Sequence, residues 1–506
     1  MQMANFQFRT DPLSGLKIEK SSENLIKWNV IAALATLAVG GLMALLVALT
    51  RWPSVHLLGA TNYYRFLTLH GIDALLAWII FFEVALVHFT STVLLGTRSY
   101  VPWLGWLAFA LMLIGGGVIN VIVLLGGADV MFTSYVPLKA DPIYYLGVIL
   151  FAVGALLGFI IFFINVTLSK RDGGYKRSLP LGSFGMAAGS IIAVLTLAHG
   201  AAIFIPTLLW ALNIIGYVDP AAYRLVFWGL GHPSQQINVS AMVAVWYMTA
   251  AFVVGSKPVN EKLSRTAFVL YILFINVASE HHLLVDPVLS TWHKIVNTSY
   301  MMHLAVLASM IHAFAIPASI EVALRRQGFT RGLFEWLKKA PWGNPAFSGI
   351  AISILLFGFL GGITGVIFGT EQFNIIRHNT WAITGHFHGT VVAGTTIAFM
   401  GFTYLLIPYI FKREIIWKGF ATIQPYLYGV GVATLSIGMM SAGQFGVPRR
   451  HYDITFSGAP FSFTFDPAID MFMSMMGVGG VLAAIGGVLY ILISFGSIIF
   501  GKKIGD

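Results

Sequence analysis

Long apolar segments recur along the whole chain and are separated by shorter polar connections. A helix needs roughly 20 apolar residues to cross the hydrocarbon core of a membrane. We therefore predict an all-α integral membrane protein with about twelve transmembrane helices, in one membrane domain over residues 28–499 between cytoplasmic tails at 1–27 and 500–506. The predicted helices cover approximately residues 28–50, 67–95, 101–126, 143–167, 184–212, 222–254, 264–285, 294–318, 347–369, 380–411, 421–444 and 469–499.

Lysine and arginine are distributed unevenly between alternate connections. With the N-terminus in the cytoplasm, most of the 30 Lys and Arg residues fall in cytoplasmic connections, among them Lys170, Arg171, Lys257 and Lys412. This positive-inside bias predicts a multi-pass protein of a prokaryotic cell membrane with both termini in the cytoplasm. The net charge of +10 then reflects topology and contact with membrane lipid, and no nucleic-acid partner is expected.

Histidines from four of the predicted helices fall at one depth, in the outer half of the membrane. Ionisable side chains inside a bilayer are expensive and usually functional, and neutral imidazole is a common metal ligand. A lone histidine is more often structural, and we place His88, His199, His303 and His312 in that class. The chain has no cysteine, so thiolate metal sites and covalent c-type heme attachment are excluded. The histidines at one depth are His70, His232, His281, His282, His386 and His388.

His386 and His388 are two residues apart near the start of a predicted helix. Successive helical residues are 100° apart, so these two side chains point to nearly opposite faces. They cannot bind one ion from a regular helix. The pair is therefore expected to reach two different metals.

Several short motifs make the chain resemble the catalytic subunit of the heme–copper oxidoreductases, which include terminal oxidases and nitric oxide reductases. The motifs around His281 and His378 are most similar to the B-type branch of the oxidases. The resemblance covers most of the chain. It rests on Tyr63-Tyr64 with Leu69-His70-Gly71, Trp228 with Gly231-His232-Pro233, His281-His282 with Asp286-Pro287 and Thr291-Trp292, His378-Asn379-Thr380 with Gly385-His386-Phe387-His388, and Pro448-Arg449-Arg450.

The resemblance implies two hemes and one copper. His70 and His388 would bind a low-spin heme, and His386 a high-spin heme. His232, His281 and His282 would hold a copper beside the open face of that second heme. An iron is the alternative metal, but the chain lacks the glutamate that accompanies iron in classical nitric oxide reductases.

Three further residues are expected near the carboxylates of the hemes. Arg449 and Arg450 precede the last predicted helix, and His378 precedes the ligand pair. Arginine pairs with carboxylates through two parallel hydrogen bonds. The resemblance implies that both arginines and His378 contact heme propionates, whereas the simpler interpretation of the arginines is two solvated charges.

Gln236 departs from the oxidase pattern. In the oxidases, a cross-linked tyrosine that supplies an electron and a proton follows the helix-six histidine by four residues. Here the stretch is His232-Pro233-Ser234-Gln235-Gln236, and residues four apart share a helix face. An amide has no accessible redox chemistry. Tyr247 and Tyr271 are too far along their helices to replace the tyrosine. The simpler interpretation of Gln236 is that its side chain only packs.

We therefore predict a nitric oxide reductase, in which Gln236 assists reduction at the high-spin heme and copper. The first alternative is a cytochrome c or quinol oxidase that reduces O2 to water and translocates protons. The second is a histidine-rich transporter. Electrons would come from a partner subunit carrying copper or heme c, or from quinol, and the substrate would be a small gas, NO or O2.

Overall fold

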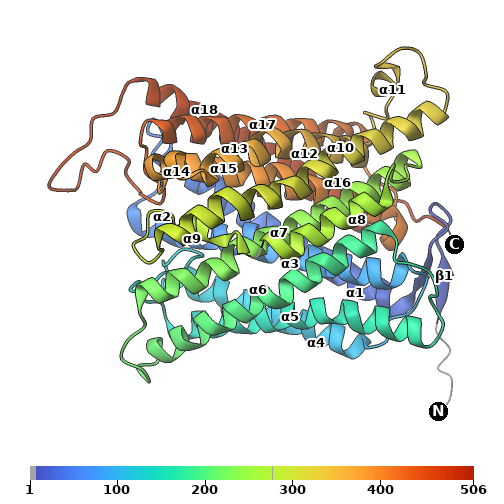
Figure 1. Cartoon of the computed structure of the whole chain (residues 1–506), viewed down its shortest axis with the longest axis horizontal. Coiled ribbons are helices and arrows are strands. Elements are labelled where there is room, and N and C mark those ends of the chain that lie inside the picture. Colours follow the sequence, from blue (N-terminus) through green and yellow to red (C-terminus); the bar gives the residue numbers. More distant parts are fainter. Residues whose placement is uncertain (1–6, 276, 506) are drawn as a thin grey trace.

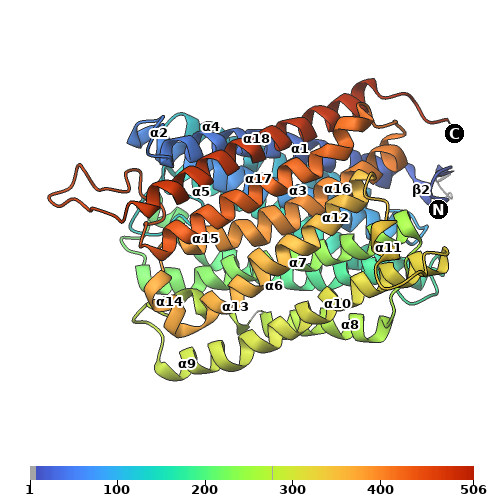
Figure 2. The same cartoon turned by 90° about the horizontal axis from the view of Figure 1, so that it is seen from above.

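The computed structural model describes residues 7–275 and 277–505, and it is almost entirely helical. The long helices lie side by side with their axes in a common direction (Figure 1), and the view from above shows that they are stacked several deep (Figure 2). Among the described residues, ten helices are long and apolar enough to cross a membrane. The predicted all-α membrane fold is confirmed.

The ten spans are α1 (Lys20–Arg51); α2 (Ala60–His70) with η1 (Gly71–Ala77), α3 (Trp78–His88) and η2 (Phe89–Val93); α4 (Pro102–Leu124); α5 (Pro142–Arg171); α6 (Leu181–Ala211); α7 (Pro220–Val254); α9 (Thr291–Ile295) with η5 (Val296–Met301) and α10 (Met302–Arg326); α12 (Pro345–Leu356) with η6 (Phe357–Ile363) and α13 (Thr364–Gly369); α15 (Trp381–Phe387) with η7 (His388–Thr396), α16 (Ile397–Leu406) and η8 (Ile407–Phe411); and α18 (Ala468–Phe500). The segments labelled η in these spans are π-helical turns within longer helices.

Two of the predicted spans do not reach the length or apolar content of the others. The segment predicted at 264–285 is formed by α8 (Glu261–Leu270), the π-helical turn η3 (Tyr271–Ile275) and the short 3₁₀ helix η4 (Ser279–Leu283). The segment predicted at 421–444 is one helix, α17 (Lys418–Gln444), with a proline and buried polar side chains. Both lie along the bundle (Figure 2), so a total of twelve crossings stays a prediction.

The first helix begins at Lys20, earlier than the apolar pattern predicts. The carboxylate of Glu19 accepts hydrogen bonds of 2.9 Å from the backbone N–H groups of Ser21 and Ser22. An N-cap side chain commonly accepts hydrogen bonds from the unpaired N–H groups of the first helical turn in this way. Before it, β1 (Phe8–Thr10) and β2 (Lys17–Glu19) pair antiparallel. Residues 8–19 thus form a small hairpin that leads directly into α1.

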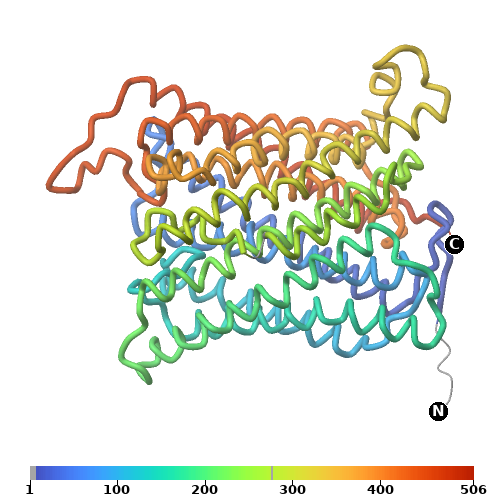
Figure 3. The backbone as a smooth tube through the Cα atoms, in the orientation of Figure 1, coloured from blue at the N-terminus to red at the C-terminus, as the bar shows by residue number. Residues whose placement is uncertain are grey.

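The bundle has two distinct ends. The strand β1, the last turn of α18 and α11 (Glu335–Lys338) lie at one end, and α14 (Glu371–Arg377) and the long connection between α17 and α18 lie at the other (Figures 1 and 3). We call these the terminal end and the loop end. Close packing between the helices is achieved at glycines. A Cβ on Gly40 of α1 would lie 2.5 Å from the backbone nitrogen of Ala74 in η1.

Candidate functional site

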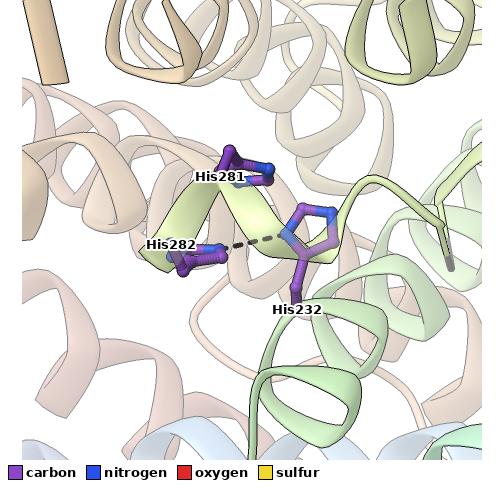
Figure 4. Close-up of side chains that lie close together, drawn as sticks. All are labelled: His232, His281 and His282. Carbon is purple, nitrogen blue, oxygen red and sulfur yellow. Dashed lines mark hydrogen bonds between the residues drawn. The ribbon is translucent and has the colours of Figure 1, made fainter. Parts of the chain in front are cut away.

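Three of the predicted histidines form one cluster. His232 is on α7, and His281 and His282 are on η4 (Figure 4). One ring nitrogen from each lies within 4.8 Å of the others, and Nδ1 of His232 is 3.1 Å from Nε2 of His282. Two nitrogens bound to one ion at about 2 Å each are separated by roughly 3 Å. The cluster therefore fits a metal held by three imidazoles.

Local contacts fix the directions of these rings. The ring of His282 stacks on Trp228, one helical turn before His232, with centroids 3.8 Å apart and planes inclined by 3°. Nδ1 of His281 is hydrogen-bonded to the backbone carbonyl of Ala278. Such contacts at the second ring nitrogen orient metal-ligating histidines. We expected His281 and His282 to end a regular helix, but they lie in a tight 3₁₀ turn, where their ring centroids are 4.3 Å apart.

Gln236 contacts this cluster directly. Its side-chain Nε2 is 3.2 Å from Nε2 of His232, while Nδ1 of the same ring faces His282. When Nδ1 binds a metal, Nε2 carries the proton and donates it to an acceptor, so the amide oxygen of Gln236 then faces the ring. Gln236 thus occupies the position beside His232 that the helical spacing predicts.

The two tyrosines considered as substitutes are engaged elsewhere. The hydroxyl of Tyr271 is 3.0 Å from that of Ser309, and the hydroxyl of Tyr247 is 3.1 Å from Nδ1 of His312. Neither tyrosine lines the cavity that contains the histidine cluster. The sequence-based argument against them is therefore supported by their positions.

His70 and His388 face each other across the same cavity. Their ring centroids are 6.2 Å apart and their planes are inclined by 23°. Two imidazoles that bind one metal at about 2 Å have centroids about 6 Å apart. Nδ1 of His70 is 3.2 Å from the carbonyl oxygen of Gly40, and Nδ1 of His388 is 2.8 Å from that of Thr384. These contacts leave both Nε2 atoms available for one iron.

His386 points away from His388, as the spacing of two residues predicts. Its Nδ1 is 2.9 Å from the hydroxyl oxygen of Thr364 on α13, and a Cβ on Gly365 would lie 3.1 Å from its ring. His386 lies close to Phe368, with ring centroids 5.8 Å apart. A glycine-lined space beside a single imidazole fits a flat ligand with one axial nitrogen.

All the predicted site residues line one cavity of about 650 Å³. It extends from the side of His70 and His388 to the side of the three-histidine cluster, and it is walled mainly by apolar side chains. The site residues on its wall are His70, His232, Gln236, His281, His282, His378, His386, His388, Arg449 and Arg450.

The wall of this cavity includes an excess of positive charge. Arg224 is paired with Asp286 at 2.8 Å, whereas the buried Nε of Arg449 has no hydrogen-bond partner. Burial and the neighbouring Arg450 lower the pKa of Arg449 to about 9. Burial and Arg449 lower the pKa of His378 to about 4. Both arginines are half-buried rather than freely solvated, and their charge fits a carboxylate-bearing ligand such as a heme.

Sequence reasoning missed several residues of this wall. Arg51, the last residue of α1, lies 4.2 Å from the ring of Trp381 and donates hydrogen bonds to the carbonyls of Pro448 and His451. Arg224 also lines the cavity, and Thr364, outside its wall, is hydrogen-bonded to His386. The signal for Arg51 was an arginine directly after an apolar span, which is also common at ordinary helix ends.

The chain is similar to subunit I of respiratory oxidases. The profile of the family described as cytochrome c and quinol oxidase polypeptide I matches residues 24–482. Subunit 1 of a Thermus thermophilus cytochrome c oxidase is 30% identical over 77% of this chain and 69% of its own length. Subunit 1 of a Bacillus spizizenii quinol oxidase is 23% identical over 89% and 69%. A chain of a heme–copper terminal oxidase dimer solved by cryo-EM superposes with a TM-score of 0.89 at 25% identity, covering 97% of this chain and 86% of that one.

Proposed function

The chain belongs to the family of heme–copper oxidase subunit I, and from that premise we propose that it is a membrane nitric oxide reductase. The proposed reaction is 2 NO + 2 electrons + 2 protons → N2O + H2O, in which an N–N bond forms and one N–O bond breaks. Proteins of this family bind two hemes and a copper. We assign the low-spin heme to His70 and His388, the high-spin heme to His386, and the copper to His232, His281 and His282.

The observation that carries the proposal is the contact between Gln236 and His232. The amide lies 3.2 Å from the ring nitrogen of His232 that points away from the cluster. It cannot supply the electron that a tyrosine supplies when the O–O bond of dioxygen is broken. NO reduction needs no such electron from a side chain, because two electrons from the donor suffice.

The chain's own residues would organise the reaction. When bound, the hemes and copper supply electrons and Lewis acidity to NO. Trp228 and the carbonyl of Ala278 hold the rings of His282 and His281 in place, so little reorganisation is needed during turnover. Gln236 fixes the tautomer of His232, and its NH2 group is left to donate a hydrogen bond toward an oxygen in the cavity. Apolar side chains exclude bulk water.

The second candidate is a terminal oxidase that reduces O2 to water. The names of the similar proteins, cytochrome c oxidase and quinol oxidase, favour it. The same names supply the two candidate donors, a cytochrome c with its partner subunit or a membrane quinol. We also propose that the protein lies in a prokaryotic cell membrane with both termini in the cytoplasm; the bacterial relatives support the first part and the charge pattern supports the second.

The deciding experiment compares the two gases on one preparation. Purified enzyme with both hemes would be given NO without oxygen, and N2O would be measured together with oxidation of an artificial donor. Oxygen uptake would then be measured with the same donor. We expect one N2O for each two NO consumed and slow oxygen uptake. Rapid oxygen uptake with negligible N2O would establish the oxidase instead.

A further inference from the structure

The carboxyl group of Glu83 lies inside the bundle and outside the cavity. Glu83 on α3 is fully buried, and no ion pair with it is found among the described residues. With the Asn238 amide oriented to satisfy its neighbours, its NH2 group donates a hydrogen bond of 3.0 Å to Oε1 of Glu83. Oε2 has no partner. An unpaired charge there would be prohibitively costly, so Glu83 holds a proton at rest.

Two amides connect this carboxyl group to the cavity. The side chain of Asn238 also lies 3.3 Å from that of Gln235, and Gln235 lines the cavity beside Gln236. Asn238, Gln235 and His232 follow one another at three-residue intervals along α7, so they lie on neighbouring parts of one helix surface. Amides do not titrate near neutral pH. Glu83 is therefore the titratable group at the far end of this polar connection.

Buried polar groups continue from Glu83 toward the terminal end. Thr90 follows Glu83 by seven residues, which places it on the same helix face about 10 Å further along. The hydroxyl of Ser183 on α6 donates a hydrogen bond of 2.7 Å to the carbonyl of Thr90. Asn165 on α5 donates one of 3.2 Å to the hydroxyl of Ser91. Thr90, Ser91, Asn165 and Ser183 are all fully buried.

We propose that Glu83 is the internal proton donor to the reaction cavity. During turnover its O–H bond breaks, and the proton crosses past Asn238 and Gln235 to the oxygen that leaves as water. The resulting carboxylate takes a proton from the terminal end, past Thr90 and Ser183, while the electrons come from the external donor. The inference rests on the proposed function for the identity of the substrate, but O2 reduction at the same cavity consumes protons as well.

The alternative is a protonated acid that only packs, and Glu83→Gln separates the two. Glutamine has the shape of a protonated glutamic acid and keeps a hydrogen-bonding partner for Asn238, but it cannot release a proton. We expect both heme bands and the rate of heme reduction by the donor to be unchanged. We expect turnover and proton uptake, followed with a pH indicator, to fall at least tenfold. Redox-difference infrared spectra should lose the band of a protonated carboxyl group.

Asp73→Asn is the matched control. Asp73 in η1 is also buried, at 1% exposure, and its partner is Asn120 on α4, at 3.0 Å. It does not line the cavity, so its neutralisation should leave more than half of the turnover. Glu83→Gln protein that keeps more than half of the wild-type turnover and proton uptake would overturn the proposal.

Two further arrangements keep the test decisive. If Glu83→Gln protein lacks either heme, Asn238→Leu is used. This variant keeps the carboxyl group of Glu83 and removes the amide that connects it to Gln235. A tenfold loss of proton uptake is expected, and unchanged uptake overturns the proposal. All variants are measured with NO and with O2. Wild-type enzyme that reduces only O2 refutes the proposed function, and the role of Glu83 is then decided by O2 turnover.

Discussion

At the scale of single residues, Gln236 makes the most informative contact. It is hydrogen-bonded to the ring of His232, whose other nitrogen faces His282. A leucine of similar volume keeps the packing and removes the hydrogen bond. One net hydrogen bond contributes about 1 kcal/mol. We expect Gln236→Leu to lower NO turnover about fivefold, since about 1.4 kcal/mol corresponds to a factor of ten.

The matched variant is Gln236→Glu, which keeps an acceptor for the proton on His232. It should retain more of the NO turnover than Gln236→Leu, measured as N2O formed per enzyme under the same donor. Heme spectra should be the same in both variants, because Gln236 contacts no residue that we assign to a heme. Equal turnover in wild-type and Gln236→Leu enzyme would mean that the side chain only packs.

At the scale of elements, the contact between α1 and η1 orients His70, a proposed heme ligand. The carbonyl oxygen of Gly40 lies 3.2 Å from Nδ1 of His70, and the same residue packs against the backbone of Ala74. A methyl group at Gly40 would meet backbone atoms, so one element must move. We expect Gly40→Ala to shift or remove the absorption bands of the low-spin heme and to leave those of the high-spin heme.

The neighbouring glycine provides the control for that prediction. A Cβ on Gly41 would have no atom within 4 Å, and alanine there also favours a helix. Gly41→Ala should therefore leave both sets of bands unchanged in reduced-minus-oxidised spectra. Equal effects of the two substitutions would show that the close approach at Gly40 does not position His70.

The same elements show what the chain's sequence can and cannot predict. Apolar length predicts the spans, and the two-residue spacing of His386 and His388 predicts that they diverge. The 3₁₀ turn that brings His281 and His282 together has no local signal of that kind. Arg51 and Arg224 reach the cavity only because distant segments pack beside them, so they were missed. The contact of Glu83 with Asn238 joins two distant helices, so it too required the fold.

At the scale of the whole molecule, different polar groups lead from the cavity toward the two ends of the bundle. The arginine cluster of Arg224, Arg449 and Arg450 lines the cavity toward the loop end, beside the residues that we propose to bind hemes. The polar groups that follow Glu83 lead the opposite way, because η2 ends α3 beside the N-terminal strands. Electrons that enter at one end and protons that enter at the other would meet in the cavity. The proposed mechanism therefore depends on which end faces the cytoplasm.

That orientation can be tested directly because the chain has no cysteine. Gly458, in the connection between α17 and α18, and Gly343, near α11, are both exposed, with no atom within 4 Å of an added Cβ. Positive-inside charge predicts that the end with both termini is cytoplasmic. In intact spheroplasts, a membrane-impermeant maleimide should label Gly458→Cys and not Gly343→Cys, and both should be labelled after lysis. Labelling of Gly343→Cys alone in intact cells would show that the topology is the reverse of the predicted one. The proton of Glu83 would then come from the outer side of the membrane.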